Sequence, residues 1–208
     1  MFAKIASATI SGFEACPVFV ETDITGGLPG FDLVGLPDTS VSESWQRVRS
    51  AVKNSGFTLP PGRIVVNLAP ADMRKEGSGL DLSIAVSVLT SMELISAELC
   101  RDYVFVGELS LNGELRHTRG VLPIALLAMQ QGYKGIVLPR DNAREALVVP
   151  ELDVVSYTTL ADLVSAFSHG AAPVADFPVR DLEHSSDDFF VCKDLAAIKG
   201  QTMARRAL

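Results

Sequence analysis

The sequence predicts an α+β fold in which helices pack on a mixed β-sheet. Three observations support this prediction. The first third of the chain holds short β-branched runs joined by glycine-containing turns, a pattern that favours antiparallel pairing. From residue 102 to residue 168, strand-like and helical patterns alternate, which is typical of an α/β layer. Hydrophobic residues make up 48% and charged residues 21% of the 208 residues, as in a protein with a packed core.

The chain is expected to open with a hairpin of two strands, at 4–10 and 17–24. The glycines of 26–30 then interrupt the pattern, and a further strand is expected at 31–35.

A helix is predicted to begin at Ser40, because Ser40 and Glu43 have the spacing of a capping box. Its apolar side chains recur at helical spacing and comprise Val41, Trp45, Val48 and Val52. Trp45 is therefore interpreted as a core residue rather than a stacking platform. The segment 54–56 would end this helix.

The central stretch of the sequence is a charged, glycine-rich loop between a buried strand at 63–68 and a helix that runs from Leu82 to Met92. Backbone N–H groups, a hydroxyl and cations would gather there near a helix N-terminus, which favours anions. The alternative is a tight turn in which Ser78 or Asp81 caps the helix. The loop residues singled out are Glu76, Gly77, Ser78, Gly79 and Asp81.

The second half is predicted to begin with a strand at 102–109, followed by a hairpin whose two-residue type I′ turn is Asn112-Gly113. An apolar helix should follow at 120–129, since Pro123 falls in its first turn.

Two short strands, at 136–138 and 154–157, are then expected on either side of a helix near 142–147. The last helix of this half should begin at Thr158 or Thr159 and end at 167.

Composition excludes several classes of protein. The net charge of −7 argues against a wholly basic nucleic-acid-binding module. No apolar run approaches the roughly 18 residues of a membrane span, and no secretion signal is recognised, so we expect a cytoplasmic protein without membrane contact. The cysteines and histidines are scattered without metal-ligand spacing, and no metal site is predicted from them.

Charge is nevertheless uneven along the chain. Six basic residues and one acidic residue lie between Ser44 and Lys75. This local excess could contact phosphates, and the alternative is a solvated helix face with charged loop ends. The candidate DNA-binding residues are Arg47, Arg49, Lys53, Arg74 and Lys75.

Several independent motifs resemble the N-terminal domain of the bacterial, competence-associated, Mg-chelatase-like AAA+ ATPases. They are Gly26-Gly-Leu-Pro-Gly-Phe31, Val34-Gly-Leu-Pro-Asp38, Val66-Asn-Leu-Ala-Pro-Ala-Asp72, Arg74-Lys-Glu-Gly-Ser-Gly-Leu-Asp-Leu82 and Gly107-Glu-Leu-Ser-Leu-Asn-Gly-Glu-Leu-Arg116. The resemblance covers nearly the whole chain. It implies a fold similar to the Lon protease C-terminal domain and to the second domain of ribosomal protein S5.

The resemblance also implies three parts: a Lon-like domain at 1–168, a linker at 169–192 and the start of an AAA+ module at 193–208. That last part resembles the lead-in helix whose residues approach adenine, here Ile198, Lys199, Gly200 and Gln201. The phosphate-binding loop would follow Leu208, and the chain has no Gly-x-x-x-x-Gly-Lys-Ser/Thr motif. ATP and Mg²⁺ are therefore expected in the full-length protein and no cofactor in this chain alone.

By resemblance, the full-length protein would be a ring-forming, hexameric DNA branch-migration helicase of natural transformation. This domain would then be a non-catalytic scaffold between subunits, or a guide for branched or single-stranded DNA without sequence preference.

Two alternatives remain. A Lon-like serine protease would need a nucleophile where this chain has Gly79 and a lysine where it has Leu122. A Mg-chelatase-type remodelling motor is the other alternative. Asp72, Glu76 and Asp81 could gather a hard cation, although capping and salt bridges would also explain these carboxylates.

Overall fold

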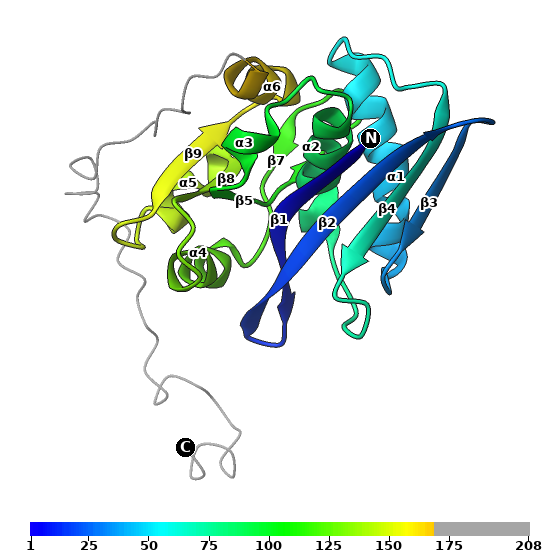
Figure 1. Ribbon diagram of the computed structural model, residues 1–208. Coiled ribbons are helices and arrows are strands. Elements are labelled where there is room, and N and C mark those ends of the chain that lie inside the picture. The colour runs from blue at the N-terminus through cyan, green and yellow to red at the C-terminus, as the bar shows by residue number, and fades with distance from the viewer. Residues whose placement is uncertain (169–208) are drawn as a thin grey trace, which may run out of the picture. The chain divides into compact units, whose positions relative to one another are not determined.

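The computed structural model describes residues 1–168, shown as the coloured ribbon in Figure 1. The strands are β1 (Phe2–Ser11), β2 (Glu14–Gly26), β3 (Gly30–Val34), β4 (Gly62–Ala69), β5 (Tyr103–Phe105), β6 (Glu108–Leu109), β7 (Leu115–Arg116), β8 (Gly135–Pro139) and β9 (Asp153–Tyr157). The α-helices are α1 (Thr39–Asn54), α2 (Asp81–Ser91), α3 (Ala97–Cys100), α4 (Val121–Gln130), α5 (Ala143–Ala146) and α6 (Leu160–Ser168). Two 3₁₀ turns, η1 (Ser78–Leu80) and η2 (Arg140–Asn142), precede α2 and α5.

Seven strands form one mixed sheet in the order β3-β4-β2-β1-β5-β8-β9, which confirms the predicted fold class. β1 and β2 form the predicted antiparallel hairpin, and β2 is also antiparallel to β4. The pairs β3–β4, β1–β5, β5–β8 and β8–β9 are parallel. β1 thus joins a mixed half, β3-β4-β2, to the all-parallel half β5-β8-β9, and it shares only one paired position with β5, Ala6 with Val104.

Helix α2 lies at the centre of the molecule, where it packs on β1 and β2 and against α1 (Figure 1). Every residue of α2 is buried, and its polar residues are mostly small serines and threonine. Its serine hydroxyls donate to carbonyl groups of the preceding turn, for example Ser83 to Leu80 at 2.9 Å. The first turn of α2, which ends the glycine-rich loop, is therefore also buried.

The predicted N-cap of α1, Ser40, was wrong by two residues. The N-cap is Asp38, whose carboxylate accepts a hydrogen bond from the Val41 N–H at 2.7 Å. Trp45 is half-buried and packs against the core, as predicted, where it stacks on Phe31 with ring centroids 3.8 Å apart.

The predicted strand at 102–109 is divided into β5 and β6, which belong to different sheets. The division occurs at Gly107, whose N–H donates to the Gly79 carbonyl at 2.8 Å and whose carbonyl accepts from Leu82 N–H at 3.0 Å. A Cβ atom at Gly107 would lie 3.1 Å from the ring of Pro139, so only glycine fits comfortably. The main chain at Gly107 therefore connects the glycine-rich loop to the first turn of α2.

The hairpin between β6 and β7 is confirmed, but its turn type was predicted wrongly. The closing hydrogen bond runs from Gly113 N–H to the Ser110 carbonyl at 3.0 Å, so Leu111 and Asn112 are the central residues. A type I′ turn needs positive φ at both central residues, whereas here Gly113 has positive φ, at 89°, and Asn112 does not.

The helix predicted at 120–129 is α4, and Gly132 follows its end with φ 76°. Helix α6 begins with the expected capping interaction between Thr159 and Asp162. The short helix α3 was not predicted.

None of the helices within residues 1–168 is long and apolar enough to cross a membrane. The predicted linker and the predicted AAA+ lead-in, with Ile198, Lys199, Gly200 and Gln201, lie outside the described residues and stay predictions.

Candidate functional site

The glycine-rich loop leaves the end of β4 and is held against the segment before α1. Lys75 N–H donates to the Leu36 carbonyl at 3.1 Å, and Asp38 N–H donates to the Lys75 carbonyl at 2.9 Å. Gly35 lets the segment before α1 pass close to the end of β4, because its φ is 100° and a Cβ atom there would lie 2.2 Å from the Leu68 carbonyl oxygen. The loop is thus fixed at its middle by main-chain bonds.

The side chain of Lys75 points into the protein and is completely buried. Its Nζ donates to the carbonyl oxygens of Met73, at 2.7 Å, and of Pro70. Burial lowers the pKa of Lys75, and the nearby Asp72 carboxylate opposes that effect. Lys75 therefore stabilises the loop from inside and presents no ammonium group to a DNA phosphate in this structure.

Arg47 and Asp81, both singled out from the sequence, form a two-pronged ion pair between α1 and α2. Arg47 Nε lies 2.6 Å from Asp81 Oδ2, and Arg47 Nη2 lies 2.9 Å from Asp81 Oδ1. The Arg47 side chain is 21% exposed, and that of Asp81 is fully buried. Asp81 Oδ2 also accepts from Leu109 N–H at 3.3 Å.

Burial raises the pKa of Asp81, while the hydrogen bonds from Arg47 and Ser44 act in the opposite direction. The carboxylate of Asp81 also raises the pKa of Arg47. Arg47 is thus committed to an internal partner, and this pair joins the two helices.

The proposal that Ser78 or Asp81 caps the central helix was wrong. Neither η1 nor α2 has a side-chain cap, since Asp81 binds Arg47 and the Ser78 hydroxyl donates to the Glu108 carboxylate. Gly77, with φ 84°, is the N-cap residue of η1. Both side chains therefore face away from the helix N-terminus.

A cleft of about 860 Å³ lies beside this loop. It is bounded by the loop itself, by the end of β1, by Glu108 of β6 and by the segment 117–120 that leads into α4. Thr9 closes the contact between β1 and the loop, because its hydroxyl donates to the Glu76 carbonyl at 3.2 Å. The predicted loop residues Glu76, Gly77, Ser78 and Gly79 all line this cleft, and Asp81 lies behind it.

The wall formed by 117–120 is held by buried Asn142. Thr118 N–H donates to Asn142 Oδ1 at 3.0 Å, and Asn142 Nδ2 donates to the Thr118 carbonyl at 2.9 Å. His117 and Arg119 consequently lie on the cleft side of a fixed main chain. Sequence reasoning missed this wall because its support lies 24 residues further along the chain.

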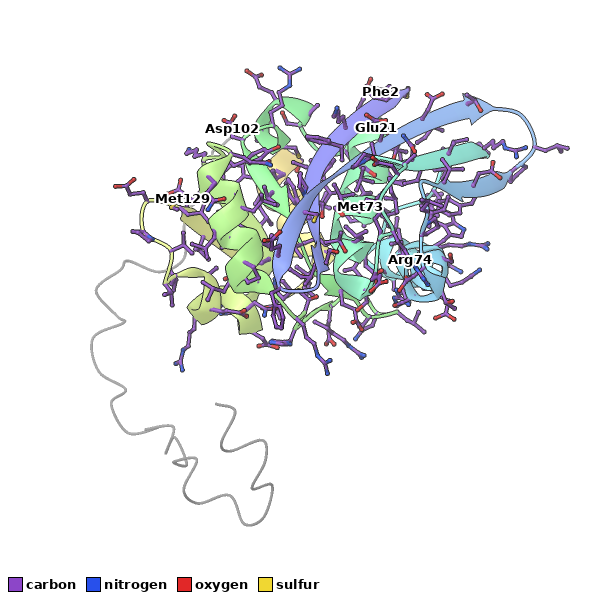
Figure 2. All side chains as sticks on the ribbon, turned by 90° about the horizontal axis from the view of Figure 1, so that it is seen from below. Phe2, Glu21, Met73, Arg74, Asp102 and Met129 are labelled. Atoms are coloured by element: carbon purple, nitrogen blue, oxygen red, sulfur yellow. The ribbon has the colours of Figure 1, made fainter. Side chains whose placement is uncertain are left out.

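The exposed face of α1 carries a second feature, which we call the α1 stripe: Ser42, Gln46, Arg49, Lys53 and Arg74. The helix residues of the stripe are spaced by three or four positions and all are exposed. Arg74, from the loop, lies at the surface beside α1 (Figure 2) and forms a shallow hollow with Thr39 and Ser42. The stripe thus gathers three of the five predicted DNA-binding residues.

A family model described as subunit ChlI of Mg-chelatase matches residues 20–142 of this chain. The chain belongs to this Mg-chelatase-like AAA+ family. Among its relatives, the competence protein ComM of Haemophilus influenzae is 39% identical over 99% of this chain and 40% of its own length. The protein YifB of Salmonella typhimurium is 45% identical over 95% of this chain and 38% of its own length.

Lon protease of Mycolicibacterium smegmatis is 27% identical over 76% of this chain and 21% of its own length, which agrees with the Lon-like fold. The chain spans about two fifths of the competence and YifB relatives that it matches.

This family member does not show the lysine–serine geometry of a Lon-type protease around Ser78. The Lys75 ammonium binds main-chain carbonyl groups, whereas the Ser78 hydroxyl binds Glu108. Leu122, at the aligned lysine position, is half-buried on α4. Within the described part of the chain, no lysine is directed at the Ser78 hydroxyl.

The three loop carboxylates considered for a hard cation do not converge. Asp81 binds Arg47, and Glu76 lies 3.7 Å from Arg74 in an exposed ion pair. Across residues 1–168, no group of three or more carboxylate, histidine or cysteine side chains could hold a metal ion.

Proposed function

We propose that this domain is the non-catalytic N-terminal part of a ring-forming AAA+ DNA motor, where it packs against neighbouring subunits and guides DNA. In this proposal the full-length protein moves DNA branches during natural transformation. Membership of the AAA+ family and similarity to a competence protein support the proposal at the level of the whole protein. At the level of this domain, the observation that carries it is the α1 stripe.

The stripe has the composition of a phosphate-contacting surface. Arg49 and Lys53 form no ion pair with any residue between 1 and 168, whereas Arg74 shares an exposed ion pair with Glu76 at 3.7 Å. From Ser42 to Lys53 the helix rises by about 17 Å, at 1.5 Å per residue, which is enough to follow several phosphates. Cations with hydroxyl and amide groups bind phosphates without reading bases.

Of the five DNA-binding residues predicted from the sequence, the proposal therefore keeps Arg49, Lys53 and Arg74. Arg47 and Lys75 each have an internal partner that they would have to leave. DNA contacts through the stripe would be independent of sequence and would weaken with salt.

We propose no nucleotide site within residues 1–168. The sequence has no Walker A motif. In the loop before α2, the Lys75 carbonyl accepts from Asp38 N–H, and Gly77 N–H donates to the Asp38 carboxylate. We assign ATP and Mg²⁺ to the part of the longer relatives that this chain does not span. The ring, a hexamer in this proposal, would be built from that part together with the present domain.

Changing Arg49, Lys53 and Arg74 together to alanine is expected to weaken the salt dependence of DNA binding. Each lost phosphate contact lowers the slope of log K against log salt by about 0.7 for single strands, so the triple variant should lose about 2. The measurement is fluorescence anisotropy of the 208-residue chain with single-stranded, branched and linear DNA across a salt series.

Arg101→Ala is the matched control, because Arg101 is an exposed arginine outside the stripe. Equal slopes for the triple variant and the parent would remove the stripe from the DNA contact set. If the chain binds no DNA even at low salt, the guiding role fails and the scaffold role remains. A remodelling motor of the Mg-chelatase type, favoured by the description of the family model, would then be the better reading.

A further inference from the structure

The cleft beside the glycine-rich loop is not explained by the proposed DNA contacts. Its walls are fixed from three sides, by the bonds of Thr9 to the loop, of Ser78 to Glu108 and of Asn142 to Thr118. A volume of about 860 Å³ is typical of a ligand site rather than a packing defect. The α1 stripe does not line it, since Arg49, Lys53 and Arg74 are absent from its walls.

One polar group on the cleft wall lacks an internal partner. Thr118 is only 8% exposed, and its main-chain groups are bonded to Asn142. Among residues 1–168, however, its hydroxyl has no hydrogen-bond partner. Thr118 Oγ1 is not fully enclosed by the protein, so it is available to a molecule that enters the cleft.

The Thr118 hydroxyl lies beside Gly79, which we call the floor of the cleft. A Cβ atom placed on Gly79 would lie 3.1 Å from Thr118 Oγ1, so the absence of a side chain at Gly79 keeps this hydroxyl uncovered. The group is thus directed at the space between the loop and the wall, within the cleft that both residues line. A ligand that enters the cleft would meet it there.

The charges of the cleft indicate the class of ligand. Three carboxylates, Asp38, Glu76 and Glu108, line it against one guanidinium, that of Arg119. Apart from His117, the formal charges of the lining sum to −3 plus 1, or −2, and Arg74, which pairs with Glu76 at 3.7 Å from outside the lining, reduces this to −1. A negative balance disfavours phosphates and nucleic acid. The lining also includes the hydroxyl groups of Ser40 and Thr118, which can form hydrogen bonds with the amides of a peptide.

We propose that this cleft binds an extended, basic segment of a partner polypeptide, with the Thr118 hydroxyl bonded to its main chain and its lysine or arginine side chains near Glu76 and Glu108. Pairing of opposite charges steers such a segment into the cleft. The segment belongs to a different protein that presents a basic, extended stretch. The proposal does not depend on DNA binding by the α1 stripe.

The test uses the 208-residue chain and two fluorescein-labelled decapeptides, one alternating lysine with valine and one alternating glutamate with valine. Fluorescence anisotropy should show at least tenfold tighter binding of the basic peptide. Thr118→Val should weaken that binding about fivefold, the usual value of one hydrogen bond. Glu108→Gln should weaken it as well, because it removes one of the three cleft carboxylates.

Stability separates this proposal from a purely structural role of Thr118. Because the hydroxyl has no internal partner, Thr118→Val should leave the melting temperature of the free chain unchanged or raise it. Thr58→Val and Glu98→Gln, at exposed positions outside the cleft, are the matched controls and should bind the basic peptide like the parent.

Three outcomes would overturn the proposal. They are equal affinity for the two peptides, unchanged binding by Thr118→Val and Glu108→Gln, and displacement of the basic peptide by spermidine at the same concentration of ammonium groups. The last outcome would show that the cleft selects a small polycation and not a peptide main chain.

Discussion

Replacing Arg47 with alanine is expected to lower the free energy of unfolding by about 3–5 kcal/mol at neutral pH, the usual cost of removing one partner from a buried ion pair. Asp81 would keep a fully buried carboxylate and lose both short bonds that Arg47 makes to it. The remaining donors, Leu109 N–H at 3.3 Å and the Ser44 hydroxyl, are neutral and cannot replace a guanidinium. Urea unfolding of the 208-residue chain measures the effect.

Arg49→Ala is the control for this prediction. Arg49 lies on the same helix and is exposed, so its loss should change the stability by no more than about 0.5 kcal/mol. A loss at Arg47 as small as the loss at Arg49 would mean that the ion pair contributes little to the fold.

The loss caused by Arg47→Ala should shrink as the pH falls from 7 to 5. Burial raises the pKa of Asp81 and Arg47 opposes it, so the pKa of Asp81 should rise further in the variant. A group whose pKa is higher in the folded state binds protons more strongly there, and stability therefore falls as the pH rises between the two values. At lower pH the protonated carboxyl no longer needs a cation.

Unfolding experiments at pH 7, 6 and 5 test this dependence. The double variant Arg47→Ala/Asp81→Asn carries no titrating group at this position, so its difference from the parent should vary much less with pH. A deficit of Arg47→Ala that stays constant over this range would contradict the assigned cause.

Replacing Lys75 with methionine is expected to lower the free energy of unfolding by about 2–4 kcal/mol, since hydrogen bonds to a charged group contribute about 1.5–3 kcal/mol each and do not add fully. Methionine keeps much of the buried stem but leaves the Pro70 and Met73 carbonyl oxygens without their donor. The same substitution should leave the salt slope of DNA binding unchanged.

Arg74→Met provides the opposite pattern at the neighbouring position. Arg74 is 69% exposed, so its loss should hardly affect stability but should lower the salt slope by one phosphate contact. If Lys75→Met lowers the salt slope and Arg74→Met does not, the assignment of these two residues is reversed.

The sequence predicted the elements better than their connections. The β1–β2 hairpin, α1, β4, α2 and α4 follow from local patterns that need no knowledge of the rest of the chain. The division between β5 and β6 could not be predicted, because it depends on Gly107 meeting Gly79 and Leu82 across the fold. The segment 103–109 is apolar except for Gly107 and Glu108, and its local pattern was interpreted as one strand.

The glycine-rich loop was singled out from the sequence, but the partners of its residues could not be predicted there. Arg47 and Asp81 were both singled out, yet they are 34 positions apart, and no local rule pairs them. A lysine in a charged loop is usually exposed, so Lys75 was taken for a surface residue. Thr118 and Asn142 were missed because neither belongs to a motif and only the fold brings them together.

Asp81 connects the cleft to helix α1. Asp81 lies two positions after Gly79, which lines the cleft. The Asp81 carboxylate binds Arg47 and so connects α2 to α1. Gly107 forms main-chain hydrogen bonds to both Gly79 and Leu82, so the main chain from Gly79 to Asp81 is held at both ends. A displacement of the cleft floor would therefore reach α1 over a path of three residues.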